Sequence, residues 1–301
     1  MKKIVISLVV ILMVVALLFT AGCTKSEKKV VIASKPMTEQ YILVEMLTYL
    51  IEGNTDITVE QKMGIGGGTS NIHPAMLEGE IDIYPEYTGT GWLFVLKEEL
   101  INDPTELYNA TKEAYEEDFE IVWSELYGFN DTFGIAVKQE LAEKLGIKTY
   151  SDLAKASPDL NFGAEYDFYE REDGYPGLET VYGFDFGEKT ELDIGLKYQA
   201  ISSDQVDVIN VFSTDGRLKE ANLVVLEDDK NFFPSYYCAT LIRKDTLKKY
   251  PELKKVLAIL DNQISNDEMT YLNYLVEIEN KDPKAVAMDF LVEKGLYEQD
   301  N

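Results

Sequence analysis

The sequence predicts an α/β fold, because short apolar segments typical of strands alternate with helical segments along the chain. The expected strands are 30–33, 81–84, 133–137, 161–164, 206–212, 223–226 and 236–242. Valine, isoleucine and aromatic residues, which favour strands, are frequent in them. The chain contains no repeat, low-complexity tract or proline- and serine-rich linker, so its length fits one large domain or two compact lobes.

Two helices are expected in the first third of the chain. Residues 38–51 are apolar nearly all round, which predicts a buried helix. A glycine-rich turn over 64–68 precedes a short helix that ends near Glu78, and Thr69 or Ser70 is expected to cap it.

The last third of the chain is predicted to be helical. Ser265 and Glu268 form a capping-box pattern before a helix over 269–278. The pair Asp-Pro at 282–283 opens another helix, which Gly295 closes. These signals concern the stability of the fold.

The first 22 residues have the composition of a secretory signal peptide. Two lysines precede a nearly unbroken apolar run over 4–19, and small residues follow at 20–22. This pattern ahead of Cys23 predicts a lipoprotein signal, with removal of 1–22 and acylation of Cys23. An uncleaved N-terminal anchor is the alternative. In both cases we expect the folded part to lie outside the cytoplasm and to be held at a membrane.

Composition and charge narrow the class of partner. The 301-residue chain has a formal net charge of −26 at pH 7, which becomes −28 when 279 residues remain after removal of 1–22. Nucleic acid is excluded as a partner, because phosphate binding needs a basic surface. We attribute the charge to solubility, and the alternative is a field that concentrates cationic ligands. No second long apolar run is present, so no transmembrane domain is expected.

Few residues are suited to catalysis or to metal binding. His73 is the one histidine of the chain, whereas hydrolytic triads and zinc sites need more, and a capping or loop role is expected for it. The glycine-rich segment 64–69 lacks the Gly-Lys-Ser/Thr ending of a phosphate loop. With Cys23 acylated, Cys238 has no partner for a disulfide, and no cofactor is implied.

Aromatic residues gather where predicted strands end in turns. The segment 82–92, DIYPEYTGTGW, offers a ring at Tyr87 and a hydroxyl at Thr90, which suits binding of a small polar molecule better than its cleavage. Phe133, Phe212 and Tyr236 stand at the ends of other expected strands. Ligands of α/β sheets collect beyond strand ends, and converging ring faces attract a quaternary ammonium group. For any one ring alone, core packing is the alternative.

Several further segments complete a pattern along the mature chain. In chain order they are 34–36 (SKP), 39–41 (EQY), 66–69 (GGGT), 86–90 (EYTGT), 127–129 (YGF), Arg171 with 173–174 (DG), 205–209 (QVDVI), 214–217 (TDGR) and 226–230 (LEDDK). Together they resemble the substrate-binding lipoproteins of ABC transporters that import glycine betaine, carnitine, choline and related osmoprotectants. The resemblance covers essentially the whole mature chain.

This resemblance implies a two-lobe fold of the periplasmic-binding-protein type II, with the ligand cleft between lobes that two crossings join. The first lobe would contain 24–130 and 232–301, and the second lobe would contain 131–231. The chain would act as a monomer that delivers its ligand to permease subunits of an ABC transporter.

The resemblance also implies a box of four rings around the trimethylammonium group: Tyr87, Phe133, Phe212 and Tyr236. The family often has tyrosine at all four positions, so any hydroxyl contact at the two phenylalanines is lost while the ring faces remain. The backbone near Asp131 is expected to supply a further face.

The ligand carboxylate would be bound by Lys35, Thr90 and Arg171, and Gln40 and Thr69 lie in matching segments nearby. From the residues alone, Arg171 could equally pair with acidic neighbours in its loop. Three alternatives stay open: the same fold binding proline or another amino acid, a surface-attached enzyme, and an adhesive role without a small ligand.

Overall fold

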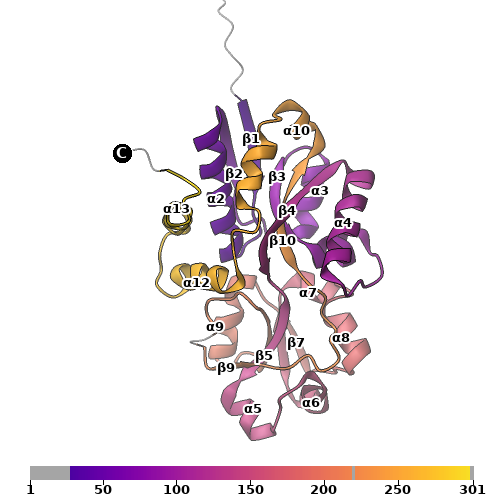
Figure 1. Ribbon diagram of the computed structural model, residues 1–301. Helices are drawn as coiled ribbons and strands as arrows, with labels where there is room; N and C mark the ends of the chain where they lie inside the picture. The colour runs from indigo at the N-terminus through magenta and orange to yellow at the C-terminus, as the bar shows by residue number, and fades with distance from the viewer. Residues whose placement is uncertain (1–27, 219–220, 299–301) are drawn as a thin grey trace, which may run out of the picture.

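The computed structural model describes residues 28–218 and 221–298 (Figure 1). The signal peptide over 1–22 and the acylated Cys23 lie outside the described residues and stay predictions. Among the described residues, none of the helices combines the length and the apolar character that a membrane span requires.

Two five-stranded sheets form the framework of the described chain, one in each lobe (Figure 1). The strands of the first lobe are β1 (Lys28–Ala33), β2 (Ile57–Lys62), β3 (Ile83–Tyr87), β4 (Ile121–Asn130) and β10 (Tyr237–Arg243), in the order β2-β1-β3-β10-β4. The strands of the second lobe are β5 (Phe133–Lys138), β6 (Asn161–Ala164), β7 (Glu188–Glu191), β8 (Val208–Phe212) and β9 (Leu223–Val225), in the order β7-β6-β8-β5-β9. The predicted α/β class with two lobes is therefore confirmed.

The strands next to the two crossings are the antiparallel ones. In the first sheet β1 runs parallel to β2 and β3, whereas β10 is antiparallel to β3 and β4. In the second sheet β5 is antiparallel to β8 and β9. The chain passes from β4 directly into β5, and it returns from β9 to β10. The crossings are hydrogen-bonded to each other, since Asp131 N donates to Tyr236 O over 3.0 Å.

Helices flank both sheets (Figure 1). Those of the first lobe are α2 (Thr38–Asn54), α3 (Thr69–Leu77), the π-helix η1 (Thr90–Leu96), α4 (Pro104–Phe119), α10 (Lys244–Lys249), α11 (Leu253–Leu257), η4 (Ala258–Leu260), α12 (Asn266–Glu277) and α13 (Pro283–Glu293). Those of the second lobe are α5 (Gln139–Leu145), α6 (Tyr150–Ala156), η2 (Ser157–Asp159), α7 (Tyr166–Glu170), α8 (Tyr175–Tyr182), η3 (Ile194–Leu196) and α9 (Lys197–Ser202).

Helix α2 lies at the centre of the first lobe. Its apolar residues are almost completely buried, and α11, α12 and α13 pack against it. The C-terminal helices thus return to the lobe in which the chain begins (Figure 1). Burial all round is what the apolar sequence of α2 predicts, because a helix without a polar face has to be covered.

Local signals in the sequence were right at some helix ends and wrong at others. The capping box of Ser265 and Glu268 is present at the start of α12, as predicted. The predicted cap of α3 is wrong: Gly68 is the N-cap with φ of 54°, and the Thr69 side chain bonds elsewhere. The loop role of His73 is also wrong, because this residue lies inside α3 and is buried against Tyr115.

Candidate functional site

A cavity of about 200 Å³ lies between the two lobes. Its lining contains the four predicted rings Tyr87, Phe133, Phe212 and Tyr236, together with Lys35, Thr69, Thr90, Asp131 and Arg171. Of the residues predicted from the sequence, Gln40 is the one that the lining does not contain. Its amide instead donates to Tyr87 Oη over 3.1 Å and to Pro85 O over 3.2 Å, so it supports a ring from behind.

The four rings meet because each stands at a strand end that faces the cleft. Tyr87 ends β3, Phe133 begins β5, Phe212 ends β8, and Tyr236 immediately precedes β10. Phe133 pairs with Phe212 across the second sheet, and the centroid of its ring lies 5.2 Å from those of Phe212 and Tyr236. The arrangement follows the rule that α/β proteins bind ligands beyond the ends of their strands.

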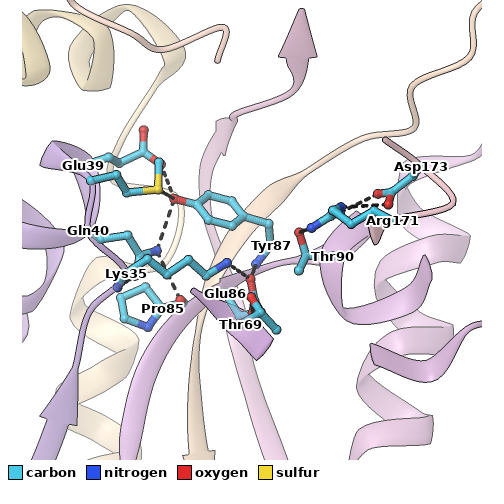
Figure 2. Close-up of polar contacts among 11 residues, drawn as sticks. Lys35, Glu39, Gln40, Thr69, Pro85, Glu86, Tyr87, Thr90, Arg171 and Asp173 are labelled. Atoms are coloured by element: carbon cyan, nitrogen blue, oxygen red, sulfur yellow. Dashed lines mark hydrogen bonds and ion pairs between the residues drawn. The ribbon is translucent and has the colours of Figure 1, made fainter. Parts of the chain in front are cut away.

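Glu86 anchors the first-lobe side of the cavity (Figure 2). This carboxylate is fully buried in β3, where Oε1 accepts from Lys35 Nζ at 2.5 Å and from Tyr87 N at 2.9 Å. Its Oε2 accepts from Thr69 Oγ1 at 2.7 Å. One buried acid therefore fixes the loop after β1, the start of α3 and the backbone of Tyr87.

Arg171 anchors the opposite side (Figure 2). Its Nε donates to Asp173 Oδ1 over 2.8 Å, and its Nη1 and Nη2 each lie 3.3 Å from Thr90 Oγ1. Tyr236 Oη donates to Asp173 Oδ2 over 2.5 Å. Burial lowers the pKa of Arg171, but Asp173 and Tyr236 outweigh burial and raise it, so the guanidinium stays charged.

A third buried ion pair lies behind Phe212. Lys197 Nζ donates to Glu165 Oε2 over 2.9 Å and to Asn210 Oδ1 over 3.2 Å, and Asn210 donates to Glu165 Oε1 over 2.9 Å. Glu165 lines the cavity. Lys197 is 1 % exposed, so the ion pair is shielded from solvent.

Each of the four rings has a cation of the chain near its face. Lys35 Nζ lies 4.8 Å from the Tyr87 centroid, and Lys197 Nζ lies 4.3 Å from that of Phe212. Arg171 Cζ lies 5.1 Å from the Phe133 centroid and 6.0 Å from that of Tyr236. These are cation–π distances. The rings are thereby oriented by internal cations, each of which is balanced by its own carboxylate.

The predicted carboxylate-binding residues form two groups. Thr90 and Arg171 are in contact with each other. Lys35 is instead held by Glu86 at the Tyr87 side of the cavity (Figure 2). The carboxylates that pair with the three cations, Glu86, Asp173 and Glu165, were not predicted as site residues, because an acidic residue in sequence is more often a solvated one.

The lobes touch directly around the cavity. Ser70 Oγ of the first lobe donates to Asp167 Oδ1 of the second over 2.9 Å. Thr214 Oγ1 of the second lobe lies 2.6 Å from Glu39 Oε2 of the first. The bonds of Arg171 to Thr90 and of Asp173 to Tyr236 also join the lobes. The structure therefore shows the lobes closed on each other.

Two α/β lobes, two crossings and an aromatic cavity between them define a solute-binding protein of the periplasmic type. The chain matches, over residues 28–293, the family described as the substrate binding domain of ABC-type glycine betaine transport system, and it belongs to that family. The family consists of binding proteins of ABC transporters and not of enzymes.

Three similar proteins illustrate the range of this family. An ergothioneine transport permease/ergothioneine binding protein of Helicobacter pylori (strain G27) is 47 % identical over 270 residues, which are 90 % of this chain and 48 % of the relative. The chain thus spans about half the length of that relative. A carnitine transport binding protein of Listeria monocytogenes is 37 % identical over 309 residues, with 100 % of both chains covered. The crystal structure of a glycine betaine/carnitine/choline ABC transporter protein has a TM-score of 0.69 at 35 % identity, and covers 91 % of this chain and 100 % of that one.

We predict that Lys197→Met lowers the free energy of unfolding by about 3–5 kcal/mol, because it leaves the buried Glu165 carboxylate without its cation. Urea denaturation measures the loss. The double variant Lys197→Met/Glu165→Gln removes the uncompensated charge and should recover most of the stability. Equal stability of the single variant and the wild type would show that Glu165 reaches water.

Proposed function

We propose that this chain is an extracytoplasmic, lipid-anchored binding protein that captures quaternary ammonium solutes and delivers them to an ABC permease. The observation that carries the proposal is the convergence of Tyr87, Phe133, Phe212 and Tyr236 on one cavity between two lobes. A trimethylammonium group cannot donate hydrogen bonds and is weakly hydrated, so ring faces are its best partners. Each ring contributes about 0.5–2 kcal/mol when it is desolvated.

Arg171 is the best candidate to bind a ligand carboxylate. A guanidinium has five N–H donors, and Asp173 occupies the edge formed by Nε and Nη2. The Nη1 side, next to the Thr90 hydroxyl, remains for a second carboxylate. Lys35 would attract the ligand carboxylate from the other side of the cavity through its charge, and its bond to Glu86 would stay in place.

Capture requires that the lobes open and close around the ligand. We propose that 24–130 with 232–301 moves as one body and 131–231 as the other, with the crossings at Asp131 and Tyr236 as hinges. A ligand that contacts both lobes favours the closed state by the difference of its affinities for the two states. A lipid on Cys23 would keep the protein near its permease.

A second candidate ligand is ergothioneine, the trimethylated betaine of a thiol-bearing histidine. The Helicobacter pylori relative carries that ligand in its name. The wall of the cavity also includes the carboxylates of Asp167 and Glu165. Glycine betaine has no hydrogen-bond donor for such a wall, whereas the ring of ergothioneine carries N–H groups. Asp167 is the better partner, because both oxygens of Glu165 already accept bonds.

The testing experiment is calorimetric titration of the mature chain with glycine betaine, carnitine, choline, ergothioneine and proline in parallel. Binding of one or more trimethylammonium compounds, with proline silent, would support the proposal. Binding of proline alone would retain the fold but refute the aromatic box, and silence from all five would refute capture of these solutes.

We predict that Phe212→Leu weakens binding of the preferred trimethylammonium ligand about 3- to 30-fold, because one ring face is lost while volume is kept. Phe233→Leu is the matched control, since that ring packs 5.7 Å behind Phe133 and does not line the cavity. The same titration measures both variants. An unchanged affinity in Phe212→Leu would remove this ring from the box.

We predict that Asp167→Asn weakens ergothioneine binding about tenfold, the cost of a charge-assisted hydrogen bond, and changes glycine betaine affinity much less. Glu170→Gln, an exposed acid-to-amide change on the same helix, is the control. Equal losses for both ligands would mean that Asp167 acts through its lobe contact with Ser70 and not on the ligand.

A further inference from the structure

A buried carboxyl cluster lies beside the ligand cavity, where the lobes meet. A second cavity of about 540 Å³ shares five lining residues with the first, Met37 and Phe212 among them. Its lining also includes Glu39, Asp215 and Glu277. Glu39 is the second residue of α2 and is 1 % exposed. The solute-binding function assigns no role to this acid.

Glu39 connects a ring of the ligand cavity to the opposite lobe. Its Oε1 accepts from Tyr87 Oη at 2.6 Å, as Figure 2 shows, and its Oε2 lies 2.6 Å from Thr214 Oγ1. Thr214 follows Phe212, which is itself a ring of the cavity, by two residues. A single side chain therefore links the Tyr87 ring of the first lobe to Thr214 of the second, two residues from the Phe212 ring.

Asn273 Nδ2 donates to Glu39 Oε2 over 3.5 Å and Thr214 N donates to Asp131 Oδ1 over 3.3 Å, but the Thr214 hydroxyl has too few hydrogens for its own two contacts. Thr214 Oγ1 lies 2.6 Å from Glu39 Oε2 and 2.8 Å from Asp131 Oδ1, yet a hydroxyl has one hydrogen to donate. The hydroxyl of Tyr87 is already directed at the other oxygen of Glu39. With both carboxylates ionised, one short oxygen–oxygen contact has no hydrogen. One proton on Glu39 or on Asp131 supplies the hydrogen that this contact lacks.

We propose that Glu39 is a positioning residue that couples the ligand-facing ring of Tyr87 to lobe closure, and that closure takes up one proton shared by Glu39 and Asp131. When the lobes open, Thr214 withdraws, water reaches both acids, and the proton leaves. This inference rests on the proposed opening and closing of the lobes.

The surroundings favour the protonated form. The titratable and charged groups around the pair are Lys35 after β1, Glu86 and Tyr87 of β3, Cys238 of β10, Asp215 and Arg217 after β8, Glu165 after β6, Lys197 and Tyr198 of α9, and Glu277 of α12. Lys35 and Lys197 are bound to acids of their own. Burial raises the pKa of Glu39 to about 7, despite the bonds from Thr214 and Tyr87, and burial with the nearby Glu39 charge raises the pKa of Asp131 well above its usual range.

The sign of the pH effect follows from these directions. An acid whose pKa is higher in the closed state favours closure at low pH, and this advantage is lost as pH rises through the closed-state pKa. Ligand affinity should therefore fall between about pH 4.5 and 7, by up to about tenfold per pH unit for one proton, and level off above pH 7.

The test counts protons directly, by titrating the full mature chain with its tightest ligand at pH 6 in two buffers of different ionisation enthalpy. The wild type should take up close to one proton per ligand. Glu39→Gln should take up nearly none, because the amide N–H supplies the missing hydrogen to Thr214. Its affinity should vary little with pH. Glu45→Gln, on the same helix, should behave as the wild type.

Thr214→Val provides a second, isosteric variant in case the charge change alters folding. It removes the shared hydroxyl, so the affinity should fall several-fold. No proton uptake in the wild type, or undiminished uptake in Glu39→Gln, would overturn the proposal.

If no ligand of the panel binds, the proposed function fails while the coupling can still be tested. Amide exchange over 212–217, corrected for intrinsic rates, should then be slower at pH 5.5 than at pH 8 in the wild type. Glu39→Gln should remove this difference. An equal difference in both proteins would refute the role of Glu39.

Discussion

The buried carboxylate of Glu86 is the interaction on which the first-lobe side of the site depends. It sits in the middle of the sheet, between β1 and β10, where no solvent can balance a charge. Lys35, Thr69 and the backbone of Tyr87 supply the donors that it needs. Removing one partner of a buried ion pair leaves an uncompensated buried charge, and this destabilises the fold far more than replacing both partners by apolar residues. The loop after β1 and the start of α3 are thus held in one position relative to the ring.

The same principle recurs on the second lobe, where Arg171 pairs with Asp173 and Lys197 pairs with Glu165. In each case a cation lies near a ring of the cavity and an acid compensates it. The Phe133 ring packs against those of Phe212 and Tyr236. Cations fixed at the ring faces, and fixed in turn by carboxylates, hold this arrangement before a ligand arrives, and such preorganisation reduces the cost of binding.

Much of the fold could be predicted from local sequence. The apolar strands around Val30 and Ile135 lie where their patterns place them, and so does the capping box of α12. Strand β7 could not be predicted, because its sequence is polar; it is the edge strand and pairs with β6 alone. The rings of the site were found at strand ends through their motifs. Their acidic partners were not, since residues such as Glu39 and Glu86 differ from solvated acids only in the tertiary contacts around them.

Charge balance inside the cavity also bears on which solutes fit. The net charge of −26 belongs mostly to exposed residues. Their fields are screened over about 8 Å at physiological salt, so this charge discriminates little among small bound ligands. Inside, three ion pairs are already neutral. A zwitterion adds no net charge to this set, and its cationic and anionic ends can meet the rings and Arg171 separately. A net cation such as choline has to be balanced by Asp131 or Asp167, and burial shifts the pKa of both acids toward the neutral form. Under the proposed function, we therefore expect a cavity built from neutralised pairs to bind betaines more tightly than simple quaternary cations.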